Sequence, residues 1–331
     1  MPHLSVINLR VTGCVIWTAQ TKKLYSINRS ATKYKKELNC EDPVEKIPEV
    51  SATISAKATK AIAKNAAQKQ LHQNWSNKAL HGKFSQRCTQ ADVDKENTFS
   101  WLKSSGMKPE TEGFIIAAQD QSLQTNNYKV HIQKTGTNAM CRYCREHQET
   151  IDHLVSGCPT LAINEYLIRH NKVAQYVHWK VCQHFDLKVV DRWYEHQTPP
   201  VTENEKVAIL WDFPIQTDRT IKANRPDIII RDKIKRTCLL IDVSIPADKN
   251  TSLKNFEKLS KYKDLEIELG KSWNMKMKTV PIIVGALGVI NRSFKKYLQE
   301  VPGKLSIHEI QKITLLGTAH ILRKALSLNT I

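Results

Sequence analysis

The sequence is poor in the residues that dominate several protein classes. Its 331 residues include 8 cysteines, 11 glycines and 12 prolines, too few for a disulfide-stapled secreted scaffold or a fibrous protein. The longest apolar stretch, Val280–Ile290, has 11 residues, well below the roughly 20 of a membrane-spanning helix. Arg10 interrupts the weakly apolar start, so no signal peptide is expected. Three cysteines crowd into positions 141–158, which favours a reducing intracellular compartment, nuclear or cytoplasmic.

Acidic residues are also scarce. There are 32 Asp and Glu against 50 Lys and Arg, a formal net charge of +18. Such a charge favours a polyanion, nucleic acid or an acidic membrane surface, and we expect nucleic acid and no membrane. No acidic residue occurs in positions 50–91, where Lys57, Lys60 and Lys64 share one face of a predicted helix. That face is either solvated or contacts phosphate, and the missing counter-charges favour phosphate contact.

The order of predicted elements divides the chain into four regions: an unassigned start at 1–21, a mainly helical basic region at 22–135, a cysteine-rich module at 136–162, and a mixed region of strands and helices at 163–331. Predicted helices cover 22–38, 51–75, two segments of 91–123 broken at 105–106, 162–186, 252–271 and 307–326. Predicted strands cover 207–213, 227–231, 237–245 and 279–289. This order predicts an α+β chain with an N-terminal helical segment and a C-terminal α/β domain.

Cys141, Cys144 and Cys158 are spaced like the ligands of a small zinc module. A turn that holds the first two cysteines, followed by a short helix with His153 and the last cysteine, can close a tetrahedral Zn²⁺ site. Four protein ligands leave no open position, so we expect a structural zinc. His147 competes as the fourth ligand. We favour His153, because a histidine separated by four residues from the last cysteine is the usual closure of a zinc knuckle.

Two aspartates stand in apolar surroundings. Asp227 leads directly into one apolar run, and Asp242 lies inside another. An ionised carboxylate in an apolar strand is costly unless a cation compensates it. Antiparallel strands joined by the polar turn at 232–236 would place the two carboxylates side by side, where they could share a divalent cation. Mg²⁺ held there could activate water against a phosphodiester, as at the front of a PD-(D/E)-x-K nuclease site.

The lysine that normally completes such a site stands two residues beyond the second acid, but Ser244 occupies that position. The next predicted helix carries Lys258, Lys261 and Tyr262 at i, i+3 and i+4, on one face. These side chains could point back at the acids. One of the two lysines, Lys261 slightly favoured, would then supply the missing ammonium group.

These residues carry a family resemblance. The runs CRYC…HLVSGC, WDFPIQTDRTIKANRPDIII, LLIDVSIP and FEKLSKYKDLEIEL resemble the C-terminal portion of non-LTR (LINE-type) retrotransposon polyproteins that use a restriction-like endonuclease. The similarity extends from near Lys22 to about Leu326 and includes a zinc knuckle, Arg-Pro-Asp and then a second acid. It implies a CCHC zinc knuckle at 136–162 and a restriction-endonuclease-like domain with a central mixed sheet at 163–331.

The resemblance also implies a function. Such nucleases nick target DNA, and the reverse transcriptase primes cDNA synthesis from the nick, so the expected partners are target DNA and element RNA. Asp227 and Asp242 would bind Mg²⁺, and Lys258 or Lys261 would be the migrated lysine with Tyr262 nearby. Arg225 is a further expected nucleic-acid contact, in addition to Lys57, Lys60 and Lys64. No Tyr-x-Asp-Asp or Ala-Asp-Asp polymerase motif occurs, so the chain looks like a truncated element product. The alternative hypothesis is a binding remnant that does not cut, and a zinc-stabilised structural protein fits the charge poorly.

Overall fold

The structure, a computed structural model, describes residues 56–327, apart from the side chains of residues 56–60, 62 and 63. The unassigned start at 1–21, the predicted helix at 22–38 and the side chains of Lys57 and Lys60 lie outside the described part. The chain divides into two units, Met1–Gly82 and Lys83–Ile331.

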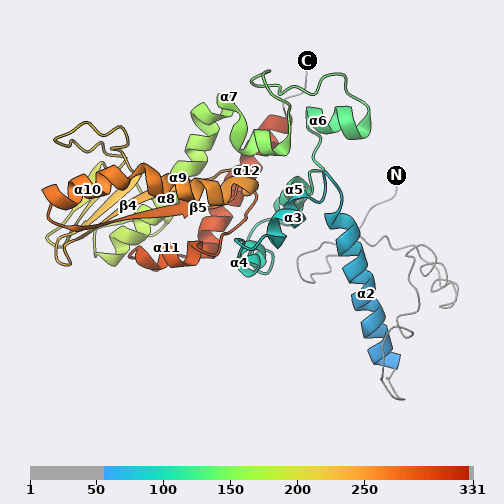
Figure 1. The fold of residues 1–331 in the computed structure, drawn as a ribbon, viewed down its shortest axis with the longest axis horizontal. Coiled ribbons are helices and arrows are strands. Elements are labelled where there is room, and N and C mark those ends of the chain that lie inside the picture. Colours follow the sequence, from blue (N-terminus) through green and yellow to red (C-terminus); the bar gives the residue numbers. More distant parts are fainter. Residues whose placement is uncertain (1–55, 328–331) are drawn as a thin grey trace. The chain divides into compact units, whose positions relative to one another are not determined.

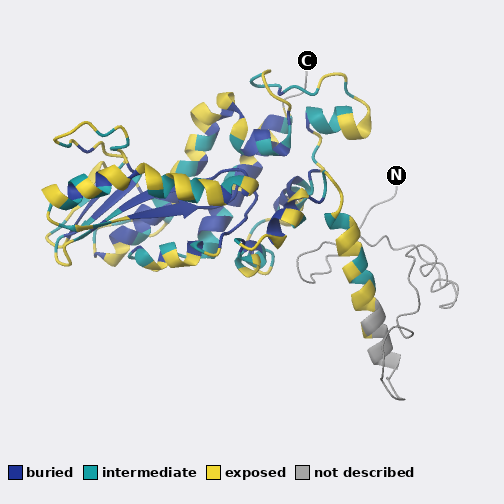
Figure 2. Cartoon of the chain, viewed as in Figure 1, coloured by how far each residue is buried: buried dark blue, intermediate teal, exposed yellow. Residues whose placement is uncertain are grey.

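The described part of the first unit contains helix α2 (Ala56–Ser76). Its sequence has neither glycine nor proline and is rich in Ala, Lys and Gln, residues of high helix propensity. The helix predicted at 51–75 is thus confirmed over its described residues. Most of their side chains are exposed or half-buried (Figure 2), Lys64 among the exposed ones. Just beyond the helix, Lys78 Nζ lies 4.4 Å from the centroid of the Trp75 ring.

The second unit contains the other helices and the strands of the described part (Figure 1). Its α-helices are α3 (Lys83–Thr89), α4 (Lys95–Ser100), α5 (Pro109–Gln119), α6 (Asn126–Tyr128), α7 (Pro159–Leu161), α8 (Leu167–His184), α9 (Thr251–Lys261), α10 (Lys263–Ser272), α11 (Phe294–Glu300) and α12 (Ile307–Ser327). Three π-helical turns are η1 (Lys129–Gln133), η2 (His153–Gly157) and η3 (Ala162–Tyr166), and two 3₁₀ turns are η4 (Trp193–Glu195) and η5 (Asp248–Asn250). The strands are β1 (Val201–Glu203), β2 (Val207–Trp211), β3 (Ile228–Asp232), β4 (Thr237–Ser244) and β5 (Lys276–Ile283). No helix among residues 56–327 is long and apolar enough to cross a membrane.

The strands of the second unit form one five-stranded sheet in the order β1-β2-β3-β4-β5. Neighbours from β1 to β4 are antiparallel, and β5 runs parallel to β4. A parallel pair needs a long crossover, and α9 and α10 lie within it. The predicted α+β class and the predicted hairpin of β3 and β4 are confirmed. Strand β1 and helix α11 were not predicted.

Helices cover both faces of this sheet. Successive strand residues point to opposite sides, and the strands carry buried apolar residues on each side. On one face, Ile228, Ile230 and Ile241 share a core with residues of α8 and α12. On the other face, Ile229 and Leu240 pack with the buried residues of α10. Figure 2 shows the strands as largely buried between the helices. Burial on both faces explains why β3 and β4 are almost continuously apolar.

The cysteine-rich module belongs to the same core as the sheet. Its Ile151, Leu154 and Val155 are buried in one hydrophobic cluster with Phe84 of α3 and with strand residues. The domain boundaries that we placed at 135 and 162 from the sequence therefore lie inside the second unit.

The helix predicted at 252–271 is wrong in extent, because α9 and α10 are separate helices. Tyr262 stands between them with φ −98° and ψ 7°, outside the helical region. Its side chain is fully buried on the α10 side of the sheet. Because the helix is broken at this point, Tyr262 can turn its ring inward toward β4, and α9 and α10 need not continue as one straight helix.

The strand predicted at 279–289 is also wrong in extent. Strand β5 begins at Lys276 and ends at Ile283. The apolar residues beyond it form a turn in which Gly288 has φ +99°, a conformation that glycine adopts at no steric cost. The buried carboxylate of Asp248 accepts hydrogen bonds of 3.0 Å from the backbone N–H groups of Leu287 and Val289. The Asp248 side chain thus accepts hydrogen bonds from backbone N–H groups that, in a longer strand, would pair with a neighbouring strand.

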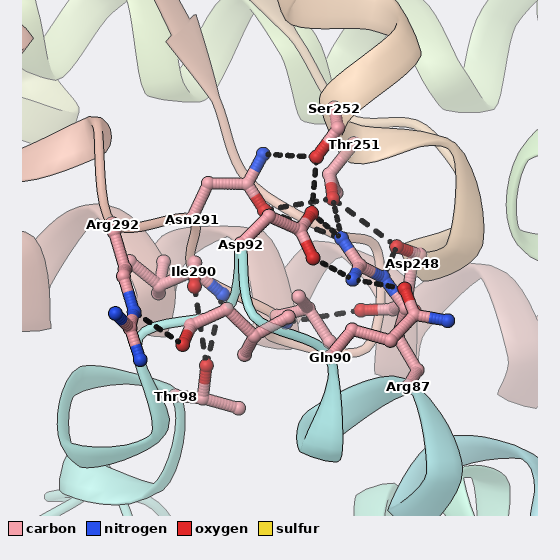
Figure 3. A network of polar contacts seen from close by, with 12 residues as sticks. Arg87, Gln90, Asp92, Thr98, Asp248, Thr251, Ser252, Ile290, Asn291 and Arg292 are labelled. Atoms are coloured by element: carbon pink, nitrogen blue, oxygen red, sulfur yellow. Dashed lines mark hydrogen bonds and ion pairs between the residues drawn. The ribbon is translucent and has the colours of Figure 1, made fainter.

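Arg87 of α3 fastens the segment before the cysteine-rich module to η5 and to the start of α9 (Figure 3). Its buried guanidinium donates to both carboxylate oxygens of Asp92 at 2.7 Å, to the backbone carbonyl of Asp248 at 2.9 Å and to the Thr251 hydroxyl at 2.8 Å. The hydrogen bonds from Arg87 lower the pKa of Asp92 to about 2, so this ion pair is charged at neutral pH. Charge-assisted hydrogen bonds of this kind are about twice as strong as neutral ones.

Replacing Arg87 by alanine is expected to lower the free energy of unfolding by about 3 kcal/mol, because buried acceptors lose their donor. Urea unfolding followed by far-UV circular dichroism measures the change. Arg219→Ala is the matched control: this exposed arginine pairs with Glu268 at 3.0 Å on the surface, and its loss should change stability by less than about 1 kcal/mol. Similar losses in both variants would contradict the role of Arg87.

Candidate metal centre and acidic cluster

Cys141, Cys144, His153 and Cys158 come together as the sequence predicts, and the atoms that they offer to a metal all lie within 4.8 Å of one another. The Sγ atoms of Cys141 and Cys158 are 3.9 Å apart, and Cys144 Sγ is 3.4 Å from His153 Nε2. Tetrahedral zinc, with Zn–S of about 2.3 Å and Zn–N of about 2.0–2.1 Å, gives edges of about 3.8 Å between two sulfurs and about 3.6 Å between sulfur and nitrogen. These four side chains, which we call the CCHC cluster, could therefore bind a metal ion.

The backbone around the CCHC cluster is tightly folded. The N–H group of Cys141 donates to the carbonyl of His147 at 2.7 Å, and Arg145, at φ +58°, donates its N–H group to the carbonyl of Cys141 at 2.9 Å. The hydroxyl of Tyr166 accepts from the N–H group of Cys158 at 3.1 Å and donates to the carbonyl of His153 at 3.0 Å. One tyrosine thus joins the two ligands that η2 separates.

His153 is the histidine of the cluster, and His147 is not. His147 is exposed, and its ring makes an edge contact with that of His153 at 5.5 Å between centroids. Burial raises the pKa of the Cys141 thiol to about 12. A metal that binds this sulfur near neutral pH must therefore displace a proton.

A buried ion pair braces the turn of the CCHC cluster, and the sequence analysis did not find it. Glu149, fully buried, accepts from the Arg142 guanidinium at 2.7 and 2.8 Å and from the Arg142 backbone N–H group at 3.0 Å. It also accepts from the N–H group of Asn126 at 2.8 Å. Acidic and basic residues are common in exposed loops, so the sequence does not distinguish this pair from solvated charges. Only its burial in the structure does.

The two aspartates of the predicted nuclease site lie at the same end of the β3–β4 hairpin. Because Ile228 pairs with Ile241, the next positions outward, Asp227 and Asp242, stand opposite each other. Asp242 is 2% exposed, and the Asp227 carboxylate accepts a hydrogen bond of 2.6 Å from the N–H group of Val243. The strand register therefore places on neighbouring strands two aspartates that 14 residues separate in the sequence.

The two lysines and the tyrosine that the sequence analysis singled out with these acids all point at Asp242. Lys258 Nζ lies 2.5 Å from Asp242 Oδ1, in an ion pair without hydrogen-bond geometry, and Lys261 Nζ lies 3.4 Å from Oδ2. The Tyr262 hydroxyl donates a short hydrogen bond to Oδ2 and accepts one of 2.7 Å from Lys261. Burial and the charge of Asp242 raise the pKa of Tyr262 above its ordinary value, so the phenol is protonated and can donate.

His170 of α8 is a further member of this acidic cluster, and no sequence motif marks it. Its Nε2 lies 2.9 Å from Asp227 Oδ2, and its Nδ1 lies 3.0 Å from Asn171 Oδ1. Both ring nitrogens thus face oxygen acceptors, as in an imidazolium. Burial lowers the pKa of His170, but its hydrogen bond to Asp227 and the charge of that carboxylate outweigh burial and raise it to about 9.

The remaining predicted nucleic-acid contacts with described side chains are Arg225 and Lys64. Arg225 is next to the acidic cluster, but its exposed guanidinium binds Asp212, with Nε 2.8 Å from the backbone carbonyl and one terminal nitrogen 2.8 Å from Oδ2. Lys64 belongs to the other unit and is exposed.

Comparison of the sequence with models of known protein families and with curated protein sequences found no match.

Proposed function

We propose that this chain is a metal-dependent endonuclease that nicks DNA, with a restriction-like catalytic domain and a zinc knuckle, derived from a non-LTR retrotransposon polyprotein. The observation that carries the proposal is the acidic cluster. Two aspartates stand opposite each other on paired strands, and α9 and the residue that follows it direct two ammonium groups and a phenol at one of them. This arrangement is what the restriction-like resemblance implies for Asp227, Asp242, Lys258, Lys261 and Tyr262.

Each group has a defined task in such a reaction. Asp227 and Asp242 would hold Mg²⁺, which supplies an activated water when bound. Lys258 or Lys261 would stabilise the negative charge that develops on the scissile phosphate. Hydrolysis adds the water oxygen to phosphorus and breaks the P–O3′ bond, and the proton passes to the leaving oxygen. The 3′-hydroxyl so formed is what a reverse transcriptase can extend.

The direct test is nicking of supercoiled plasmid by the full chain in Mg²⁺ and in EDTA. Conversion to the open circle in Mg²⁺ alone supports the proposal. Absence of any nicking over a range of Mg²⁺, Mn²⁺ and plasmid sequences would contradict it.

One observation favours a second candidate, a nucleic-acid-binding protein that does not cut. Asp242 already lies against two ammonium groups, and Asp227 against a protonated imidazole. Three positive groups balance two carboxylates without a divalent ion, so a metal must compete with the lysines for Asp242. Binding of DNA or RNA without cleavage, unchanged by Mg²⁺, is the result that this candidate predicts.

Binding to duplex DNA is expected to be mainly electrostatic in either case. If about five phosphates are neutralised, the slope of log K against log salt would be roughly −4 to −5. Charge reversal at Lys57, Lys60 and Lys64 should flatten the slope by about 1 for each lysine that contacts a phosphate. Reversal of three lysines of the second unit, Lys188, Lys295 and Lys296, is the matched control. Equal slopes in the two triple variants would mean that the α2 face is merely solvated.

A further inference from the structure

A second group of side chains that could hold a metal ion shares no residue with the CCHC cluster or the acidic cluster. His178 and Cys182 are four residues apart on α8, so they share one face of the helix. His196 directly follows η4, in the segment that leads to β1. Their relative exposures are 0%, 0% and 7%. Three residues of the types that zinc prefers thus meet inside the protein. Their proximity is therefore not a chance grouping of exposed side chains.

Their distances are close to those of a metal site. The three ligand atoms lie within 4.8 Å of one another. Cys182 Sγ is 3.5 Å from His178 Nδ1, and His178 Nδ1 is 2.8 Å from His196 Nε2. Around tetrahedral zinc these edges would be about 3.6 Å and about 3.3 Å. The sulfur–nitrogen edge fits as it stands, and the nitrogen–nitrogen edge needs to open by about half an ångström, which a small rotation of one imidazole provides.

Neighbouring groups hold the ligands in place. The side-chain amide of Gln175, on the same helix, donates a short hydrogen bond to the backbone carbonyl of His196. The ring of Trp211 on β2 stands edge-on to that of His178, with centroids 5.7 Å apart. A histidine pair that serves packing alone would account for the contact between His178 and His196. It would not account for a thiol, one helical turn away, that faces the same nitrogen.

We propose that His178, Cys182 and His196 form a second metal site, which binds Zn²⁺ and fastens the segment before β1 to α8. Two imidazoles and a thiolate are a donor set that zinc accepts. Binding forms two Zn–N bonds and one Zn–S bond and releases the thiol proton to solvent. Three protein ligands would leave the fourth position of a tetrahedral zinc to a water molecule or another small ligand. The same helix carries His170, so the ion would also hold in place a neighbour of Asp227.

Metal analysis of the full chain tests this site without any cleavage assay. After saturation with Zn²⁺ and removal of free metal, the wild type should retain two ions per chain. Cys182→Ala and His196→Gln should each retain one. The matched control is Cys238→Ala: Cys238 is equally buried, on β4, but lies in an apolar cluster, and this variant should keep two ions.

Cobalt identifies which ion is lost. With Cys141 and Cys144 changed to serine to remove the CCHC cluster, one Co²⁺ should remain, with a thiolate-to-cobalt absorption band that further change of Cys182 to Ala abolishes. If circular dichroism shows that Cys182→Ala is unfolded, His196→Gln tests the second metal site instead. His196 follows a short turn, so its replacement does not change the helix. One ion per chain in the wild type, or two in folded His196→Gln, would overturn the proposal.

Discussion

Nicking of supercoiled DNA should fall at least about 100-fold when either Asp227 or Asp242 is replaced by asparagine, because each change removes a carboxylate ligand of the proposed Mg²⁺. Asparagine keeps the shape of the side chain and its hydrogen-bonding capacity. The Val243 N–H group and the Tyr262 hydroxyl, which donate to the two carboxylates, therefore keep an acceptor. The measurement is the initial rate of open-circle formation at saturating Mg²⁺.

DNA affinity should stay equal or increase in both variants, since a negative charge near phosphate is removed. Asp232→Asn is the matched control. This aspartate lies at the other end of β3, where it accepts from the backbone N–H groups of Ile234 and Lys235 in the hairpin turn. It should nick at the wild-type rate. If folded Asp242→Asn cuts as fast as the control, the acidic cluster is not the catalytic site.

Loss of one zinc ion per chain is the result expected for Cys144→Ser and for Cys158→Ser. Each removes one of four ligands, and the binding free energy of a structural zinc, on the order of 10 kcal/mol or more, is also folding free energy of the segment around it. Amide hydrogen exchange over residues 135–165 should therefore become much faster in these variants, while the sheet remains protected.

Cys88→Ser provides the control for this experiment. Cys88 is a buried thiol of α3 and does not belong to the CCHC cluster, so zinc content should not change. Chelation of the wild type with EDTA should reproduce the faster exchange of the two cluster variants. Full zinc content in Cys158→Ser would refute the ligand assignment.

Local patterns in the sequence were sufficient for much of the fold. The apolar runs of β2, β3 and β4, the polar hairpin turn and the amphipathic α12 each have a period or a boundary that a short window of residues reveals. The ligand set of the CCHC cluster was predictable for a similar reason. Its members lie within 18 residues, so the spacing alone restricts how they can meet.

Contacts between distant segments were not predictable. His170 meets Asp227 across 57 residues, and Arg87 meets Asp248 across 161. No local pattern distinguishes these side chains from solvated ones. Likewise, the break between α9 and α10 and the early end of β5 occur because Tyr262 and Asp248 satisfy groups elsewhere in the fold. A helical or apolar run in the sequence carries no sign of such a partner.

The sequence by itself determined most of the strands and helices, the charge and the residue types that can bind metal, since these depend mainly on neighbours along the chain. The tertiary structure decided which of those residues meet. It set Asp227 opposite Asp242 through the β3–β4 register, and it buried His178 and Cys182 against His196. The physical reason is that a side chain's charge and ligand chemistry belong to the residue, whereas its burial and its partners depend on how α8, the hairpin and α9 pack together.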